Sequence, residues 1–305
     1  MKCSFCNKKS IYFRRNEGHH YCDIHLSRSI ERRVRKTIRE NDLIDKKDNI
    51  VIALSGGKDS STTLILLTKI FKNNPKIQID ALTIDIGFPH IEEDIEVGKE
   101  LTKKLKVKHH IFSLKEEFGI GIEDIFKRNP EKSPCAICGV LRRYLINKKT
   151  RELGYKKVAT GHNLDDESQS ILMNFLKGDM MRLARSGAMP MITKNSKFVS
   201  RIKPLIKIPE EEVEIFVKIN GIKYSPQECP YRKYNTFRGE TIKYLNNMER
   251  NSPGIKYSLL ESALRLKSQI EKQFEKSEIK LCKKCKEPTS KKICKTCEVL
   301  GGVLS

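Results

Sequence analysis

The sequence lacks a long apolar run. No stretch approaches the roughly eighteen apolar residues that a membrane-spanning helix needs. The N-terminus also lacks the apolar segment of a signal peptide, because Cys3 and Cys6 stand where that segment would lie. These two absences predict a cytoplasmic protein with no membrane partner.

Acidic residues are scarce relative to basic ones. The 305 residues include 60 Lys and Arg but 38 Asp and Glu, which leaves a formal net charge of +22. This excess favours a polyanionic partner, nucleic acid first, although part of it can be solvated surface in a lysine-rich chain. A chain of this length is expected to form one main domain with small appendages.

The segment 50–60 joins an apolar run to a helix through a turn with two glycines. The five apolar residues Ile50–Leu54 are typical of a buried parallel strand. Gly56 and Gly57 let backbone N–H groups approach an anion, and the helix that follows adds unpaired N–H donors. A Walker A loop is excluded, because Ile52 stands where that motif requires a glycine. The side chains that complete the predicted phosphate site are Ser55, Lys58 and Ser60.

Predicted strands and helices alternate after this turn. We expect strands at 77–84, 107–112 and 156–160, and helices at 91–105, after Cys135 and from Ile208 to near Gly221. The segment 202–205 indicates only a return to regular structure. The alternation predicts an α/β fold with a doubly wound parallel sheet, whose ligands bind at the carboxyl ends of the strands. Asp85 closes the second strand, where it is either a ligand of magnesium or nucleotide or only a helix cap.

A second polar motif, Gly-His-Asn-Leu-Asp-Asp-Glu at 161–167, follows the last of these strands. Acids beside a phosphate site hold Mg²⁺ or orient a nucleophile. The alternative is an acidic helix N-terminus that is stabilised by the helix dipole. The phosphate loop on the same sheet edge favours the functional interpretation.

The ten cysteines fall into three groups. In a reducing compartment, metal binding is favoured over disulfides, which are the alternative. Two groups are paired knuckles with the spacing of a tetrahedral zinc site, although His19 or His20 could replace a ligand in the first. The expected zinc ligands are Cys3, Cys6, Cys22 and His25 near the N-terminus, and Cys282, Cys285, Cys294 and Cys297 near the C-terminus.

The third group comprises Cys135, Cys138 and Cys229. Three thiols suggest an iron–sulfur cluster with one iron that lacks a protein ligand. Cys135 and Cys138 are expected to open a helix, whose N-terminus would lower their thiol pKa values. The alternative is a redox disulfide between these two, with Cys229 an unrelated thiol.

Basic residues gather in three further segments. The segment 27–40 predicts a basic helix that either faces RNA or links two modules. The segment 177–198 predicts a loop or short helix able to approach RNA, and 235–276 predicts helices broken around 253–254. In the last segment, phosphate contacts or an ordinary solvated face are equally compatible with Arg238, Lys243, Arg250, Lys256, Arg265 and Lys267.

Four motifs together resemble the TtcA/TtuA family of tRNA 2-thiouridine synthetases, within the PP-loop ATP pyrophosphatase superfamily. They are Ser-Gly-Gly-Lys-Asp-Ser at 55–60, Pro-Cys-Ala-Ile-Cys at 134–138, the acidic motif at 161–167, and Cys229. The knuckles at both ends are similar to those of the TtuA and archaeal–eukaryotic cytoplasmic thiolation branch. The resemblance covers essentially the whole chain.

The resemblance implies an adenine nucleotide alpha hydrolase-like fold that transfers AMP from ATP to O2 of a tRNA uridine, which sulfur then replaces. It implies Mg²⁺, two Zn²⁺ and a 4Fe–4S cluster on Cys135, Cys138 and Cys229. The implied partners are tRNA, a second copy of the chain, and a sulfur donor that is a ubiquitin-like thiocarboxylate protein or sulfide. Relatives act at the wobble or the T-loop uridine, and the motifs do not choose between them.

The resemblance also assigns individual residues. Catalytic roles fall on Cys135, Cys138, Cys229, Asp165, Asp166 and Arg142. The residues expected at ATP are Ala53, Leu54, Ser55, Gly56, Gly57, Lys58, Asp59, Ser60, Asp85, Gly161 and His162.

We expect four regions: an N-terminal zinc finger at 1–27, the PP-loop domain with its basic lead-in helix at 28–222, a helical region at 223–277 that carries Cys229, and a zinc ribbon at 278–305. Two other functions compete with tRNA thiolation. A PP-loop enzyme for a small substrate would not need the three spare cysteines or so much positive charge. A non-catalytic zinc-containing RNA-binding protein would not need the phosphate loop.

Overall fold

A computed structural model describes the chain except residues 90, 190–196, 226–228, 232–235, 274–279 and 302–305. At its centre lies a five-stranded parallel sheet of order β5-β4-β3-β6-β7. The order reverses between β3 and β6, so the predicted doubly wound topology is confirmed. The strands are β3 (Asn49–Ala53), β4 (Gln78–Asp85), β5 (His109–Ser113), β6 (Lys157–Ala159) and β7 (Ser200–Ile202).

Alternate residues of the central strands enter two separate apolar cores. Ile50, Ile52 and Ala159 belong to the first core, whereas Val51 and Val158 belong to the second. Neighbouring strands keep this alternation in register, because Val51 pairs with Val158. Such continuous apolar strands are expected where helices cover both faces. Only the three-residue edge strand β7 was not predicted from the sequence, which indicates there no more than a return to regular structure.

The first core lies under helices that carry the phosphate loop and the acidic motif. They are α1 (Asp23–Glu40), α2 (Lys58–Phe71), α3 (Ile91–Leu105), α7 (Leu164–Leu176), α9 (Glu210–Ile219) and α11 (Ile255–Gln273). Each places its buried apolar residues on one stripe, as Leu26, Ile30 and Val34 do in α1. The helices predicted at 27–40, 91–105 and after Ile208 are therefore confirmed, with α9 preceded by Pro209 at its N-cap.

The second core lies under helices from a different part of the chain. They are α4 (Leu114–Phe118), α5 (Ile122–Lys127), α6 (Pro134–Glu152) and, from the far C-terminus, α12 (Lys295–Leu300). Helix α6 begins with Ser133 as its N-cap and Pro134 in the first turn, both preferred at those places. It therefore brings Cys135 and Cys138 to the carboxyl edge of the sheet.

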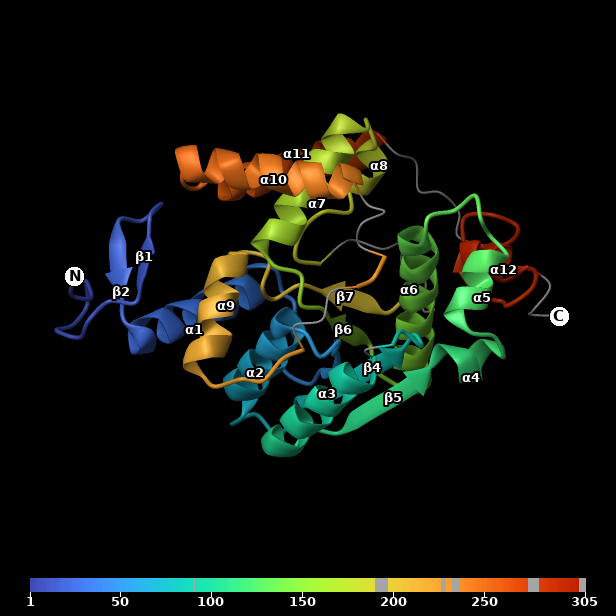
Figure 1. Cartoon of the computed structure of the whole chain (residues 1–305), viewed down its shortest axis with the longest axis horizontal. Coiled ribbons are helices and arrows are strands. Elements are labelled where there is room, and N and C mark those ends of the chain that lie inside the picture. Colours follow the sequence, from blue (N-terminus) through green and yellow to red (C-terminus); the bar gives the residue numbers. More distant parts are fainter. Residues whose placement is uncertain (90, 190–196, 226–228, 232–235, 274–279, 302–305) are drawn as a thin grey trace.

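Two more helices extend the layer formed by α7 and α11 (Figure 1). Helix α10 (Thr236–Asn251) packs against α7 and α11, and the short α8 (Met180–Leu183) contacts the same two helices. The break predicted at 253–254 is confirmed by the gap between α10 and α11. The N-terminal hairpin of β1 (Tyr12–Arg14) with β2 (His19–Tyr21) and the C-terminal helix α12 lie on opposite sides of the molecule (Figure 1). A second two-stranded hairpin pairs β8 (Lys280–Leu281) with β9 (Pro288–Thr289). No helix in the described ranges has the length and apolar character to span a membrane.

Candidate active site

The turn between β3 and α2 has a backbone that requires glycine. Gly56 has φ +75°, and a Cβ there would lie 2.6 Å from the carbonyl oxygen of Asp94 at the start of α3. The Ser60 hydroxyl accepts the backbone N–H of Ser55 at 3.1 Å and donates to the Gly57 carbonyl at 3.1 Å. The loop therefore has a fixed shape, with the N-terminus of α2 open to an anion.

The acidic motif lies directly against this loop. A Cβ on Gly161 would lie 2.7 Å from the backbone nitrogen of Ser60, so only glycine permits the close approach. The Asn163 side chain donates to Asp59 Oδ1 at 2.9 Å and also caps α7 by accepting the N–H of Asp166 at 3.0 Å. The two motifs, which lie about a hundred residues apart in the sequence, therefore form one site.

Lys58 lies among carboxylates at this site. Its Nζ is 3.1 Å from Asp59 Oδ2 and 2.7 Å from Glu210 Oε1. Burial alone would lower the pKa of Lys58, but the two carboxylates raise it, so the ammonium stays charged. Burial raises the pKa of Asp59. A lysine in this position can exchange its carboxylates for the phosphates of a nucleotide.

A cavity of about 290 Å³ lies between Glu210 and two of the cysteines. Its wall contains Cys135 from the start of α6 and Cys229 from the segment after α9, so the two converge although 94 residues separate them. Asp165 and Asp166 line the same cavity, as predicted for a shared sheet edge. The other lining residues are Gln169, Glu210, Arg238, Gly239 and Ile242.

The segment that carries Cys229 is held by the phosphate loop. The backbone N–H of Ser225 donates to the Gly56 carbonyl at 3.1 Å. Beyond the cysteine, the Tyr231 carbonyl accepts from the Cys135 thiol at 3.5 Å. Cys229 itself is exposed. Backbone contacts therefore place this exposed thiol beside α6.

The prediction that the α6 N-terminus lowers the thiol pKa values is wrong. Burial raises the pKa of both Cys135 and Cys138, and the nearby Arg142 only partly offsets this at Cys138. Desolvation therefore outweighs the helix terminus at these two thiols.

Lys256 is not a surface phosphate contact. It is buried in α11, where its ammonium binds Asp165 Oδ1 and, at 2.6 Å, Asn246 Oδ1. The other oxygen of Asp165 accepts the Glu210 backbone N–H at 2.8 Å. Lys267 likewise donates to the Ser186 carbonyl at 3.0 Å. Asp165 is thus fixed on both sides.

The other acids of the motif differ in their surroundings. Asp166 is half-exposed and lies 3.2 Å from the guanidinium of Arg238, while desolvation raises its pKa. Glu167 is buried and accepts from Lys203 Nζ at 2.7 Å and from the Gly187 N–H at 2.7 Å, which fixes the chain after α8. Among the described residues, these acids do not bring three ligand atoms as close together as the two four-ligand sites do.

Three residues expected at the site lie on its outskirts. Asp85 Oδ1 accepts the Gly87 N–H at 2.7 Å within its own turn, so it is not a helix cap. His162 bonds Thr160 Oγ1 at 2.8 Å, and desolvation together with Lys203 lowers its pKa to about 4. Arg142 is exposed on α6, one turn beyond Cys138.

Leu54, also expected at ATP, lies at the end of the apolar run before the phosphate loop. Its carbonyl accepts a hydrogen bond from the Thr83 hydroxyl at 2.8 Å.

The two terminal cysteine sets form compact four-ligand sites. In each, the ligand atoms lie within 4.8 Å of one another. The Cys6 and Cys22 sulfurs are 3.7 Å apart, as are those of Cys282 and Cys297. Zinc–sulfur bonds of about 2.3 Å in a tetrahedron place sulfurs about 3.8 Å apart, whereas a disulfide needs about 2.05 Å. Both sites can therefore bind one metal ion, and the disulfide alternative is wrong.

Neither alternative histidine enters the N-terminal set. His25 Nδ1 is 3.3 Å from the Cys22 sulfur, whereas His20 stacks on Phe13 and His19 lies against Phe5. The four residues expected from the spacing therefore lie together, and their role as metal ligands stays a prediction.

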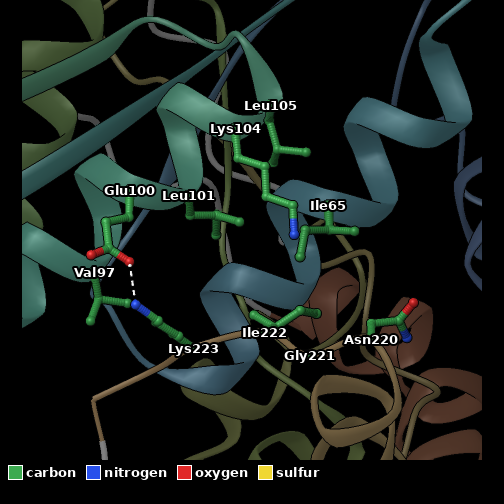
Figure 2. Close-up of a pocket in the computed structure, with 10 residues that line it drawn as sticks. All are labelled: Ile65, Val97, Glu100, Leu101, Lys104, Leu105, Asn220, Gly221, Ile222 and Lys223. Carbon is green, nitrogen blue, oxygen red and sulfur yellow. Dashed lines mark hydrogen bonds and ion pairs between the residues drawn. The ribbon is translucent and has the colours of Figure 1, made fainter.

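A second cavity of about 340 Å³ lies between α2, α3 and residues 220–223 (Figure 2). Its floor is apolar, formed by Ile65, Leu101 and Ile222, and an ion pair of Lys223 with Glu100 at 3.1 Å lies at one side. It contains none of the predicted site residues. It lies between packed helices and shares no lining residue with the cavity that contains Cys135 and Cys229.

Comparison with known proteins agrees with this geometry. A model of the PP-loop domain family matches residues 26–243. The tRNA-5-methyluridine(54) 2-sulfurtransferase of Pyrococcus horikoshii is 34% identical over 302 residues, which cover 99% of this chain and 94% of the relative. The chain belongs to the PP-loop family of tRNA 2-thiolation proteins.

Two more members of this family show the same extent of similarity. The tRNA 2-thiolation protein NcsA of Haloferax volcanii is 31% identical, with 99% of both chains covered. Among solved structures, the U34-tRNA thiolase NcsA from Methanococcus maripaludis with its [4Fe-4S] cluster has a TM-score of 0.85 at 32% identity, covering 98% of this chain and 95% of that one. The similarity therefore includes both terminal modules.

Sequence analysis did not place three of the lining residues at the site: Glu210, Gln169 and Arg238. Glu210 carried a signal, because it follows Pro209 in the first turn of a segment that we interpreted only as a helix start. Arg238 was named only as a possible phosphate contact on a helical face, and Gln169 had no signal, since both reach the cavity through the packing of α7 against α10.

Proposed function

We propose that this protein is an ATP-dependent tRNA 2-thiolase that activates O2 of a uridine by AMP transfer and replaces it with sulfur. One observation carries the proposal: Cys135, Cys229 and the acids of the second motif line one cavity, and Asn163 of that motif binds Asp59 of the phosphate loop. The relatives named above act on tRNA, and the net charge of +22 suits that substrate.

In this scheme the chain first binds ATP at the glycine-rich loop. The backbone N–H groups after Gly56 and the ammonium of Lys58 hold the phosphates, with Mg²⁺ on the neighbouring carboxylates. The uridine O2 attacks the α-phosphorus and pyrophosphate leaves. A sulfide equivalent from the donor then bonds to C2, and AMP leaves with the former O2. Asp165, fixed by Lys256, is held where it can orient the reacting groups.

Two kinds of metal site fit the donor sets. The four-ligand sets suit two structural Zn²⁺ ions, because their sulfur separations match a zinc tetrahedron. Cys135, Cys138 and Cys229 suit a 4Fe–4S cluster, because Cys135 and Cys229 line one cavity and Cys138 lies near enough to interact electrostatically with both. Such a cluster would supply an iron without a protein ligand, on which sulfur can bind. Arg142 lies one turn from Cys138 and can contribute positive charge there.

The remaining assignments extend this proposal. The other residues expected at ATP line the loop or its rim, and the sulfur donor is a ubiquitin-like thiocarboxylate protein or sulfide. We propose a cytoplasmic protein that acts as a homodimer, and the regions 1–27, 28–222, 223–277 and 278–305 remain a predicted division. The relatives act at either U54 or U34, so mapping of the modified nucleotide by mass spectrometry decides between the two positions.

Two variants test the proposal in opposite directions. Cys229→Ala, prepared anaerobically, should keep two zinc ions, ATP binding and tRNA binding, but lose the visible absorbance of the cluster and form no 2-thiouridine. Lys58→Ala should keep the cluster and both zinc ions but release no pyrophosphate. Zinc and iron analysis, pyrophosphate release and nucleoside mass spectrometry measure these outcomes. Wild-type thiolation by Cys229→Ala would contradict the assigned role of the thiol, and pyrophosphate release by Lys58→Ala would contradict the ATP site.

A further inference from the structure

Two arginines from different elements lie together on the α6 side of the sheet. Arg201 is the middle residue of the edge strand β7 and pairs in register with Val158, whose side chain lies in the core under α6. Its side chain therefore leaves the sheet on the same face, and its Nη2 donates to the backbone carbonyl of Arg143 in α6 at 3.1 Å. The register of the sheet brings the two residues together.

The Arg143 guanidinium lies back along its own helix toward the cysteines. A Cβ on Gly139 would lie 3.2 Å from Arg143 Nη1, so the side chain covers the surface beside that glycine. Gly139 immediately follows Cys138. The guanidinium thus lies about one helical turn from the thiols that line the candidate active site.

Neither arginine has a carboxylate partner among the residues that the structure describes. A third arginine, Arg182 of α8, adds its positive charge to Arg143 and is itself paired with Asp179 at 3.2 Å. Desolvation and the neighbouring arginines lower the pKa of Arg143, and desolvation together with Arg143 lowers that of Arg201 to about 10. Like charges held together in this way cost stability unless an anion binds between them.

The guanidinium groups of Arg143 and Arg201 suit a phosphate as the bound anion. Guanidinium groups bind phosphate oxygens with two parallel hydrogen bonds. The phosphates of ATP already have a site at 55–60, and neither arginine lines the cavity next to it. Arg143 is exposed and Arg201 is half-buried, and the Arg143 guanidinium lies about one helical turn from Cys135 in the cavity wall, where the backbone of an RNA entering the site would pass.

We propose that Arg143 and Arg201, with Arg182 at the rim, bind a backbone phosphate of the RNA next to the nucleotide that reacts. The identity of the RNA rests on the proposed function. The pair holds the strand beside the thiols, so that the target base can enter the cavity while its backbone stays outside.

The test compares Arg143→Gln, Arg201→Gln and the double variant with Arg35→Gln, a control in α1 whose arginine pairs with Glu31 on the surface. An unmodified tRNA transcript is titrated by filter binding between about 50 and 200 mM salt. The double variant should bind at least about tenfold more weakly, and its slope of log Kd against log salt should fall by about 0.7–0.9, the contribution of the one phosphate contact that the pair would lose. Arg35→Gln should match the wild type.

A second readout separates binding from folding. Without tRNA, the double variant should melt at the same temperature as the wild type or higher, because it lacks the repulsion between the arginines. Affinity and stability should therefore change in opposite directions. Unchanged tRNA affinity and slope, a weaker affinity that accompanies a lower melting temperature, or a loss of ATP rather than tRNA affinity would each overturn the inference. Failure of the wild type to form 2-thiouridine would instead refute the proposed function, which the binding assay does not use.

Discussion

The two terminal modules use similar four-ligand sites but attach to the body of the protein in different ways. The N-terminal module inserts Arg14 of β1 between elements of the first core, where the residue is 2% exposed. Its Nε and Nη2 each donate to a carboxylate oxygen of Glu212 in α9 at 2.8 Å. Arg33 of α1 binds the same carboxylate at 3.1 Å. The attachment of this module combines these buried ion pairs with packing of Tyr12 and Tyr21 against the first core.

The C-terminal module attaches mainly by apolar packing. Val299 and Leu300 of α12 belong to the second core, and Asn129 donates to the Val299 carbonyl at 2.8 Å. Its ion pair, Arg151 with Glu287, lies nearer the surface. The ligand spacing at the two ends is alike, so the comparison shows that metal ligands and attachment are set by separate residues.

Removal of the buried Glu212 carboxylate should have the largest effect on stability, because it breaks the ion pairs between Glu212 and the two arginines Arg14 and Arg33. Glu212→Ala leaves Arg33 without a carboxylate and leaves the buried Arg14 with only the partly exposed Glu17, which should cost about 3–5 kcal/mol of unfolding free energy. Urea unfolding of the zinc-loaded protein measures the loss. Glu214→Ala in the same helix is the control and should cost less than about 0.5 kcal/mol. A loss below about 1 kcal/mol for Glu212→Ala would show that the buried pairs do not hold the module.

Truncation of Leu300, which packs α12 into the second core, should have a somewhat smaller effect on stability. Leu300→Ala removes a side chain that is 2% exposed from the second core, but α12 lies near the chain end and can shift to fill the space. We expect about 2–3 kcal/mol, the lower part of the range for buried leucine. Lys295→Ala on the exposed side of α12 is the control. Zinc content should stay at two ions in both variants, and loss of the second ion from Leu300→Ala would show that packing and metal binding are not separate.

The smallest expected effect is the loss of the Glu17 carboxylate. Its contribution to stability depends on pH, which distinguishes the ionic contacts of the N-terminal module from the apolar packing of the C-terminal one. Burial alone would raise the pKa of Glu17, but its bonds to Arg14 and Tyr21 lower it overall. A carboxyl with a lowered folded-state pKa adds stability above its unfolded pKa of about 4.3, and the gain is lost as the pH falls through the folded value. Glu17→Gln should therefore cost less than about 1 kcal/mol at pH 7, since the side chain is 38% exposed, and nothing at low pH.

The measurement is the difference in unfolding free energy from the wild type across pH, with Glu123→Gln as control. The deficit of Leu300→Ala should stay constant over the same range, because no titrating group is removed. A pH-independent deficit for Glu17→Gln would mean that the carboxylate contributes only packing.

Much of the fold follows from local patterns. The apolar run at 50–54 and the alternation of strands and helices predicted the parallel sheet, because strands covered on both faces need apolar residues on both. The edge strand β7 was not predicted, because it has only three residues and pairs with a neighbour on one side only. Strand pairing is a property of neighbours in space, which a short segment does not encode.

The sequence by itself determined the groups that can bind phosphate and metal. Glycine spacing, cysteine spacing and helix caps act over a few residues, so Gly56 and the four-ligand sets follow from local sequence, as does the Asn163 cap. Only the tertiary structure decided what the charged residues do. Lys256 binds Asp165 inside the protein, whereas Arg143 and Arg201 meet without an acid among the described residues, although all three look alike as basic residues in a basic chain. The physical reason is that the state of a charge depends on burial and on partners far away in the sequence, and folding alone brings these together.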